Sequence, residues 1–415
     1  MFDAAPATSK RGGRRFLLRA AFDRLLRGLV LEGTLTLRYP DGSETKHSAG
    51  PGPAVTLEVK SWRAVREVIL NPNLAFGEAI TDGTIVPVDC RIYDVLAMLI
   101  DARHQGGWQP VLLVRDALSR IGKRWAQFNP ARRARRNVAH HYDLNGQLYA
   151  LLLDQDRQYS CAYFRHGDET LDEAQLAKKR HIAAKLLLDR PGLRVLDIGC
   201  GWGGMALTLA REYGADVTGI TLSQEQLEAA RARAMDAGLS DRVRFELMDY
   251  RAVTGKFDRI VSVGMFEHVG INHYRRFFDV VRRSLNEDGV ALIHAIGRSH
   301  GPEFTNPWLA KYIFPGGYSP ALSEATPAAE KSGLIVTDIE ILRLHYAKTL
   351  SAWRANLDRN REAITALYDE RFCRMFEFYL SGAELAFRRS GHMVWQMQLA
   401  RRQDAVPLTR DYIKE

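Results

Sequence analysis

Between residues 194 and 298, short apolar runs alternate with segments whose apolar positions recur at helical spacing. The apolar runs are near-continuous, as in strands buried on both faces of a sheet. This alternation predicts a parallel sheet covered by helices on both sides, with ligands bound beyond the carboxyl ends of the strands. The predicted strands are "RVLDIG", "DVTGIT", "RVRFELM", "FDRIVSV" and "GVALIHAI", the last entered through a turn at Asp288-Gly289, and the predicted helices are 203–213, 223–237 and 273–285.

The first hundred residues have a different pattern. Residues 14–31 have apolar positions at helical spacing, and residues 33–47, "GTLTLRYPDGSETKH", alternate like strands around Asp41-Gly42, which is a hairpin signal. We therefore expect a smaller α+β domain over residues 1–125, a basic linker over 126–140 and a second domain over 141–415.

A segment rich in proline, glycine and aromatic residues follows the last predicted strand. It covers residues 299–321, "SHGPEFTNPWLAKYIFPGGYSPA". We predict a lid over an apolar channel, and a packed loop is the alternative. The apolar face of this lid would consist of Trp308, Tyr312, Ile313 and Phe314.

The composition is that of an ordinary globular protein, with 46% hydrophobic and 26% charged residues among 415. No apolar run is long enough to span a bilayer. Seven Lys or Arg interrupt the first thirty residues, so we expect no secretory signal and a cytoplasmic location. The four cysteines form no C-x-x-C pair, which argues against a disulfide framework or a zinc site.

The net charge of +9 is partly local. Basic residues cluster near the N-terminus, and a second cluster follows Pro130. Such clusters attract polyanions, either nucleic acid or an anionic membrane surface, although a solvated charged face explains either cluster alone. The two clusters are Lys10, Arg11, Arg14, Arg15, Arg19, Arg24 and Arg27, and Arg132, Arg133, Arg135 and Arg136.

The sequence "LDIGCGWGG" has glycines at positions 199, 201 and 204 that fit G-x-G-x-x-G between a strand and a helix. A dinucleotide-binding protein would have an acid about 20 residues further on. Here that stretch is "GITLSQEQ", and no acid ends the strand. Asp197 instead precedes the glycines, and "MDYR" closes the next strand. This order of parts resembles class I S-adenosylmethionine-dependent methyltransferases, with Asp197 serving the ammonium group and Gln226 the ribose.

Seven separated motifs indicate one family within this class of methyltransferases. They are "HHYDLNGQLYALLLDQDRQYSCAYF", "LDIGCGWGG", "TLSQEQ", "VSVGMFEHVG", "LIHAIG", "YIFPGGYSP" and "LHYAKTL". Together they closely resemble the cyclopropane-fatty-acyl-phospholipid synthase family, which includes the mycolic acid cyclopropane synthases. The resemblance runs from about residue 137 to the C-terminus. The N-terminal part looks like the longer bacterial synthases, except that Ala79 and Ile80 stand where a tyrosine-containing pattern is expected.

The resemblance implies a Rossmann-like α/β fold with a mostly parallel seven-stranded sheet. It also implies that a cis double bond of a phospholipid acyl chain attacks the sulfonium methyl of S-adenosylmethionine, giving a carbocation that loses a proton on ring closure. The family's base is a bound bicarbonate. Its motif positions match Cys161, Glu267, His294, the backbone carbonyl of Ile296, and Tyr346.

The cofactor contacts carry over from the same motifs. They are Tyr159, Ser160, Leu196, Asp197, Ile198, Gly199, Cys200, Gly201, Trp202, Gly203, Thr221, Leu222, Ser223, Gln224, Glu225, Gln226, Tyr250 and Arg251. Tyr318, Phe164, Phe266 and Tyr346 are the aromatic rings that could face a carbocation, or they could belong to the core.

Each proposed residue also has a structural interpretation. Cys161 alone is typical of a small buried residue, and His294 lies in an apolar strand. Glu267 ends the "VSVGMF" strand, where an acid facing a ligand is expected and an acid facing a core is costly. We expect His268 to line the same loop. A family cysteine is replaced by Ala383, so a thiol there cannot be the nucleophile.

Three alternatives stay open. A related enzyme would use the same first step to leave a methyl or methylene branch. More distant alternatives are a nucleic-acid-binding methyltransferase and a non-catalytic lipid-binding homologue. The expected partners are unsaturated acyl chains and the anionic inner face of a membrane, without nucleic acid, and a homodimer is left open.

Overall fold

A computed structural model describes residues 8–104 and 146–413. The predicted linker, the arginines at 132–136 and the domain boundaries near residues 125 and 140 lie outside these ranges. The chain divides into two compact units. Unit 1 consists of the described parts of Met1–Ile121 with Asn306–Ile313 and Arg361–Ser390, and the rest of the described chain forms unit 2.

Unit 1 contains a four-stranded sheet in the order β2-β1-β3-β4. The predicted hairpin is confirmed, because β1 and β2 pair antiparallel around Asp41-Gly42 and Gly42 has a φ of +77°. The side chains of β1 alternate in burial, and Leu35 and Leu37 enter the core. The strands are β1 (Thr34–Arg38), β2 (Glu44–Ser48), β3 (Ala54–Val59) and β4 (Ile85–Val88), and the helices are α1 (Thr8–Arg27), α2 (Trp62–Leu70), α3 (Pro72–Thr81) and α4 (Ile92–His104).

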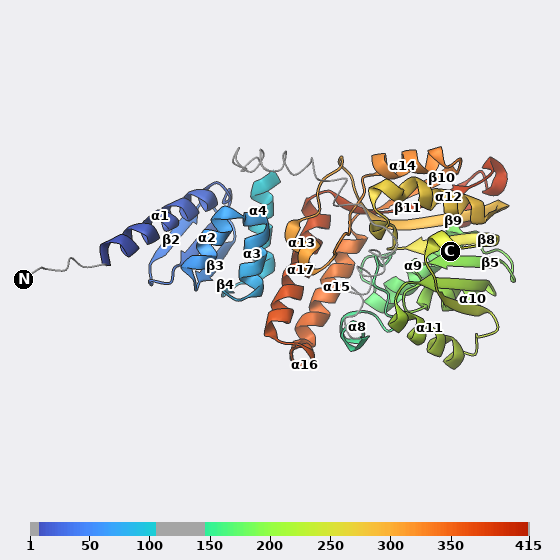
Figure 1. The fold of residues 1–415 in the computed structure, drawn as a ribbon, viewed down its shortest axis with the longest axis horizontal. Helices are drawn as coiled ribbons and strands as arrows, with labels where there is room; N and C mark the ends of the chain where they lie inside the picture. Colours follow the sequence, from blue (N-terminus) through green and yellow to red (C-terminus); the bar gives the residue numbers. More distant parts are fainter. Residues whose placement is uncertain (1–7, 105–145, 414–415) are drawn as a thin grey trace, which may run out of the picture. The chain divides into compact units, whose positions relative to one another are not determined.

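Three helices from the second half of the sequence complete unit 1. They are α13 (Pro307–Tyr312), α16 (Arg361–Leu367) and α17 (Glu370–Arg389). Helix α17 packs on α3 and α4, and Figure 1 shows α13 and α17 beside α3. These segments were predicted to belong to the second domain, whereas most of their contacts are with the N-terminal elements.

Trp308 anchors α13 to unit 1. Its side chain is 1% exposed and its ring lies 4.7 Å from that of Phe378 in an edge-on contact. A Cβ at Gly77 would lie 2.6 Å from the Trp308 ring, so glycine is required for this close approach. For Trp308 the packed-loop alternative therefore describes the structure, and the lid stays a prediction for the remainder of 299–321.

Unit 2 is built on a seven-stranded sheet in the order β10-β11-β9-β8-β5-β6-β7. The five strands from β9 to β7 in this order are parallel. Strand β11 is antiparallel to both of its neighbours, β9 and β10, so it alone of the seven runs in the opposite direction, which confirms the predicted mostly parallel sheet. The strands are β5 (Arg194–Ile198), β6 (Asp216–Thr221), β7 (Val243–Leu247), β8 (Phe257–Val263), β9 (Leu285–Arg298), β10 (Ile335–Leu342) and β11 (His392–Ala400).

Helices cover both faces of this sheet. Val195 and Leu196 of β5 enter different core clusters, because successive side chains of a strand point to opposite faces. One cluster joins the sheet to α9 (Leu171–Lys185), α10 (Gly204–Tyr213) and α11 (Gln224–Asp236). The other joins it to α12 (Tyr274–Ser284) and α14 (Leu322–Lys331), and both groups are labelled in Figure 1. The remaining helices of unit 2 include α8 (Gly146–Leu152) and α15 (His345–Arg359).

Strand β9 differs from its prediction. Asp288-Gly289 was expected to be the turn before this strand, but β9 already begins at Leu285. Leu285 pairs with Phe257, and the next pair joins Val290 to Arg259. The residues between them therefore bulge out of the ladder, which accommodates the glycine without ending the strand.

Candidate active site

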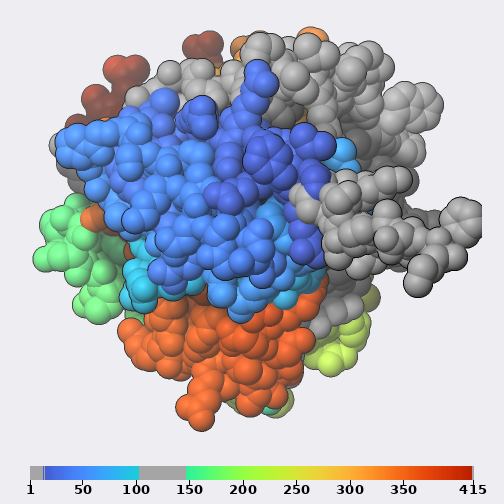
Figure 2. Space-filling view, turned by 90° about the vertical axis from the view of Figure 1, so that its left-hand side faces the viewer, coloured from blue at the N-terminus to red at the C-terminus, as the bar shows by residue number. Residues whose placement is uncertain are grey.

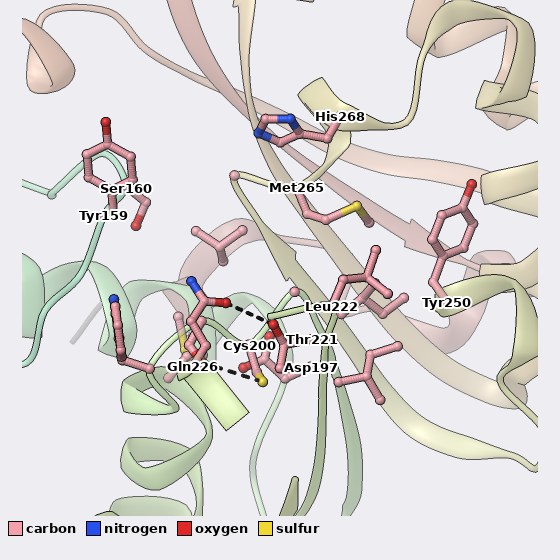
Figure 3. A pocket seen from close by; sticks show the side chains of 18 of the residues that line it. Tyr159, Ser160, Asp197, Cys200, Thr221, Leu222, Gln226, Tyr250, Met265 and His268 are labelled. Carbon is pink, nitrogen blue, oxygen red and sulfur yellow. Dashed lines mark hydrogen bonds between the residues drawn. The ribbon is translucent and has the colours of Figure 1, made fainter. Parts of the chain in front are cut away.

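A pocket lies at the carboxyl ends of the parallel strands of unit 2. Its walls come from the loops after β5, β6, β7 and β8 and from the segment that precedes α9. In Figure 3, Tyr159 and Tyr250 lie on opposite sides of the view, with Met265 and His268 above Asp197 and Thr221. The position agrees with the prediction that ligands bind beyond the strand ends.

The glycine loop turns sharply between β5 and α10. Gly199 and Gly201 have φ values of +83° and +54°, which favour glycine. A Cβ at Gly199 would also lie 2.9 Å from the Cβ of Met265 on the opposite wall. The Gly199 and Cys200 N–H groups donate to the Ile220 carbonyl, which ties the loop to β6. The loop can therefore lie close to a ligand.

Asp197 places a buried carboxyl in the pocket wall. Its side chain is 2% exposed, and its Oδ2 has no hydrogen-bond partner within the described part of the chain. Burial raises the pKa of Asp197 to about 7. A ligand with an ammonium group would supply the missing partner and favour the ionised carboxylate. The methionine end of S-adenosylmethionine fits this position.

Gln226 is held with its amide oriented. The Ser223 N–H donates to Thr221 Oγ1, so the Thr221 hydroxyl proton is directed to Gln226 Oε1 at 2.8 Å. The NH₂ group of Gln226 is then the end that is available to a ligand, as expected for a neutral partner of a ribose.

Of the eighteen predicted cofactor contacts, the pocket wall contains thirteen. Leu196 points into the apolar core, Gly203 starts α10 with its Cα facing Phe245, and the Ser223 hydroxyl caps α11. Gln224 and Glu225 point elsewhere, to Glu228 and to the Gly146 N–H respectively. The thirteen are Tyr159, Ser160, Asp197, Ile198, Gly199, Cys200, Gly201, Trp202, Thr221, Leu222, Gln226, Tyr250 and Arg251.

The wall also contains residues that sequence analysis did not assign to the cofactor. One of them is Asp249, an acid that follows the end of β7. Its position at the carboxyl end of a parallel strand could have identified it as a ligand-facing residue. It caps the following turn and pairs with Arg251 at 2.6 Å. His268 lines the pocket, and burial lowers its pKa to about 4. The others are Arg157, Gln158, Met205, Ile220, Met248, Val263, Gly264, Met265 and Val269.

None of the five predicted catalytic residues lines this pocket, and four of them are linked to residues that do. Cys161 and Glu267 are sequence neighbours of Ser160 and His268, which do line it. The carbonyl of His294 accepts from the N–H of Gly264, another wall residue. Tyr346 is connected to the pocket wall through Trp353. The ring of Trp353 packs edge-on against Tyr346 and stacks on Tyr159, which lines the wall.

Glu267 is the second buried carboxyl next to the pocket. Its Oε1 accepts from the Ile296 N–H at 2.6 Å, and its Oε2 has no hydrogen-bond partner among the described residues. Burial raises the pKa of Glu267 to about 7. Near neutral pH this carboxyl can therefore accept or donate a hydrogen bond toward a ligand.

His294 and Cys161 are both neutral. Burial lowers the pKa of His294 well below its ordinary value, and burial raises the pKa of the Cys161 thiol. His294 Nδ1 lies 3.2 Å from Nε2 of Gln396, the residue opposite it on β11. A protonated thiol is a poor nucleophile, so Cys161 is suited to packing or to weak hydrogen bonding.

Lys178 of α9 is a buried cation that sequence analysis missed. Its Nζ donates to Gln158 Oε1 at 2.6 Å and to Ser160 Oγ at 2.8 Å. Burial lowers its pKa to about 8. Its positive charge also works to lower the pKa values of Asp197, Cys161 and His294, although burial has the larger influence on each. The sequence did contain a signal that Lys178 is buried. Helical spacing places positions 174, 178, 182 and 185 on one face of α9, and this face also carries apolar residues.

Two of the proposed aromatic residues belong to the core. Phe266 stacks on Tyr274 with ring centroids 4.4 Å apart and is fully buried. Tyr318 is 2% exposed, and its hydroxyl donates to Glu324 at 2.7 Å. Neither ring lines the pocket.

Across residues 8–104 and 146–413, no helix combines the length and apolar character needed to cross a bilayer. In the same ranges, no three potential ligands among His, Cys, Asp and Glu gather into a metal-binding group.

The sheet order, the glycine loop and the buried carboxyl beside it define a class I S-adenosylmethionine-dependent methyltransferase. Comparison with protein families is more specific. The model described as mycolic acid cyclopropane synthetase matches residues 129–397, and the chain belongs to this family.

Three relatives illustrate the similarity. The cyclopropane-fatty-acyl-phospholipid synthase of Escherichia coli is 38% identical over 85% of this chain and 89% of its own. The tuberculostearic acid methyltransferase of Mycobacterium tuberculosis is 34% identical over 96% of both chains. A crystal structure of a mycolic acid cyclopropane synthase complexed with SAH and CTAB is 35% identical and has a TM-score of 0.61. That match covers 66% of this chain and 99% of the other.

Proposed function

We propose that the protein is a cyclopropane-fatty-acyl-phospholipid synthase. S-adenosylmethionine would supply the methyl carbon, which adds to a cis double bond of a phospholipid acyl chain. The resulting carbocation closes to a three-membered ring as one proton leaves, so the lipid gains one carbon and two hydrogens overall.

One observation supports this proposal above the others. Two buried carboxyls, Asp197 and Glu267, each have an oxygen without a partner among the described residues, at neighbouring strand ends beside the glycine loop. Unpaired buried carboxyl oxygens are costly unless a ligand satisfies them. Asp197 suits the ammonium group of the cosubstrate, which leaves Glu267 for the reacting end.

The proposal includes a bicarbonate ion held by the residues that match the family motif. A bound bicarbonate would supply the base for the departing proton. Glu267 can accept from its hydroxyl, and His294 and Tyr346 have N–H and O–H groups that can donate to its oxygens. Because Glu267 Oε1 is already held by the Ile296 N–H, the Oε2 atom is the one that remains for an ion.

The test uses purified protein, S-adenosylmethionine and vesicles that contain cis-monounsaturated phospholipid. We expect acyl chains that gain CH₂, survive mild hydrogenation and give cyclopropane ring protons by NMR. Omitting bicarbonate from degassed buffer should slow the reaction, and adding it back should restore the rate. A protein that binds S-adenosylmethionine but never changes the acyl chain would contradict the proposal.

A second candidate product is a methylene branch. It is favoured by the 34% identical tuberculostearic acid methyltransferase, whose match spans 96% of this chain. The branch forms if a hydride first shifts from the methylated carbon to the adjacent cationic carbon, and a proton then leaves the new methyl group to give a C=CH₂ group. A methylene branch has the same mass as the ring but takes up hydrogen under mild hydrogenation, so the same experiment separates the two products.

We also propose that unit 1 docks on the anionic inner face of the membrane through α1. Phe16 and Leu17 of this helix are 71% and 67% exposed, and Arg24 and Arg27 are exposed nearby. Apolar side chains beside arginines suit insertion among anionic headgroups. Figure 2 looks onto a face where the first residues of unit 1 are seen in dark blue. Sedimentation with vesicles tests this docking, and analytical ultracentrifugation without lipid determines whether the protein is a monomer or a homodimer.

A further inference from the structure

A row of three buried polar side chains connects helix α9 to His294 in the sheet. His294 of β9 and Gln396 of β11 lie directly opposite each other, and Lys185 of α9 packs on Gln396. All three side chains are at most 2% exposed. Polar groups buried this deeply are placed by the hydrogen bonds they make.

Lys185 determines which way the amide of Gln396 faces. An ammonium group can donate but cannot accept, so the atom 2.9 Å from its Nζ must be the amide oxygen of Gln396. The other end of the amide, its NH₂ group, then faces His294 Nδ1 at 3.2 Å.

Burial lowers the pKa of Lys185, and this shift is opposed by the charge of Glu340 on β10. Its carboxylate contacts the Lys185 ammonium and lies 2.6 Å from His181 Nε2. Burial works to raise the pKa of Glu340, but the hydrogen bond from His181 and the charge of Lys185 together lower it to about 2. A carboxylate that stays ionised opposes the loss of the Lys185 proton.

The orientation of the amide decides where the His294 ring holds its proton. An NH₂ group can only donate to Nδ1, so Nδ1 must present its lone pair, and the proton of the neutral ring is on Nε2. We propose that Lys185 and Gln396 are positioning residues that hold His294 as the Nε2–H tautomer, so that its ring donates a hydrogen bond toward the reacting site. This inference rests on the proposed function, in which His294 is a donor to the bound anion.

The first test observes the tautomer without any substrate. Protein labelled with ¹⁵N-histidine is studied by long-range ¹H–¹⁵N correlation, and the His294 signals are assigned by their loss in His294→Gln. We expect a protonated Nε2 and an unprotonated Nδ1 in the wild-type protein. A proton on Nδ1, or on both nitrogens at neutral pH, would overturn the proposal.

The discriminating variant is Gln396→Glu, since free imidazole also favours Nε2–H. The new carboxylate can only accept, so we expect a proton on Nδ1 of His294. The kcat should fall by about 10²-fold, as for the loss of one oriented donor, while the affinity for S-adenosylmethionine stays unchanged. His294 remaining as Nε2–H in this variant would contradict the inference.

The matched control is Gln398→Glu. Gln398 lies on the same face of β11, is equally buried, and contacts the Lys185 carbonyl and Thr337 instead of His294. The Gln398→Glu substitution should leave His294 as the same tautomer as in the wild-type protein. If it shifted the His294 proton as much as Gln396→Glu does, the effect would be one of general packing, and the proposal would be overturned.

A second pair of variants tests Lys185 itself. Lys185→Met frees the amide of Gln396 to rotate, so we expect a mixture of His294 tautomers, and Lys185→Arg should restore one. An unmixed Nε2–H form in Lys185→Met would exclude Lys185 from the role. If the tautomers respond as expected but vesicles gain no carbon, the proposed function fails while the positioning role stands. If vesicles gain carbon and the tautomers do not respond, only the positioning role fails.

Discussion

The two units of this protein bury their side chains in different ways. In unit 1 the distant helix α17 contributes Leu385 to the apolar core, and the buried carboxyl of Glu384 on the same helix is paired with Arg388. Unit 2 has comparable apolar clusters on both faces of its sheet, but it also buries carboxyls such as Asp197 and Glu267 with one oxygen unpaired among the described residues. The difference indicates that substitutions in unit 1 should act on stability, whereas these carboxyls of unit 2 should act on ligands and chemistry.

The largest effect is expected from Glu267→Gln. Replacing the carboxyl by an amide keeps the shape but removes the acceptor proposed to orient the base, so kcat should fall by about 10³-fold. Turnover of vesicle lipid measures kcat. Calorimetric titration measures the affinity for S-adenosylmethionine, which should be unchanged. Full activity in this variant would show that Glu267 has no role in the reaction and would contradict the difference drawn between unit 1 and unit 2.

Trp308→Ala tests unit 1. Removing a fully buried indole should lower the free energy of unfolding by about 4 kcal/mol, measured by urea denaturation followed by circular dichroism. The affinity for S-adenosylmethionine should stay the same. A weaker affinity for lipid without any loss of stability would instead support the lid over residues 299–321.

The pH dependence of stability should differ between wild type and Glu267→Gln. Burial raises the pKa of Glu267 from 4.5 to about 7, so the folded state holds this proton more tightly than the unfolded state does. The stabilisation is complete below pH 4.5 and is lost as the pH rises to about 7. At 1.36 kcal/mol per pKa unit the loss is about 3 kcal/mol. Urea denaturation across this range should show the loss in wild type and a flatter profile in the variant. Parallel profiles would mean that Glu267 ionises freely.

Asp197→Asn should weaken the binding of S-adenosylmethionine by about 10²-fold, because an amide cannot offset the charge of the ammonium group. In the wild-type protein the raised pKa of Asp197 means that the carboxylate forms as the pH rises to about 7. Affinity should therefore strengthen by about tenfold per pH unit below 7 and level off above it. Titration from pH 5.5 to 8 measures this slope, which should be absent in the variant. An equal slope in both proteins would assign the effect to another group.

The smallest effect concerns the surface of unit 1. Phe16→Ser combined with Leu17→Ser should weaken binding to anionic vesicles by about tenfold while activity on detergent-dispersed lipid is retained. Leu70→Ser combined with Met235→Ser removes equally exposed apolar side chains elsewhere and serves as the control. Equal binding by both double variants would contradict docking through α1.

Much of the fold was predictable because local signals determine it. The strands of unit 2 are near-continuous apolar runs, and Asp41-Gly42 and the glycine loop are short motifs with one backbone solution. The position of α17 was not predictable, because an amphipathic helix does not specify which distant surface will cover its apolar face. The bulge in β9 was mistaken for a turn because Asp-Gly suits both.

The pocket was predicted less completely than the sheet. Motifs located the glycine loop and the end of β6, but pattern alone could not separate Asp197, which faces the ligand, from Leu196, which faces the core. The buried lysines of α9 were missed because lysine is ordinarily solvated. Their function depends on partners such as Ser160 and Gln396, which are contributed by distant segments.

The use of α17 in unit 1 affects how this protein is made. A ribosome adds residues one after another, so the surfaces of α3 and α4 emerge well before the helix that shields them, which follows the strands β5 to β10 in the sequence. During that interval the nascent polypeptide exposes an apolar surface, and unit 2 can pair only the strands from β9 to β7, because β10 joins the sheet through β11, which follows α17. The packing of unit 1 and the sheet of unit 2 are therefore both completed only after α17 and β11 have been translated.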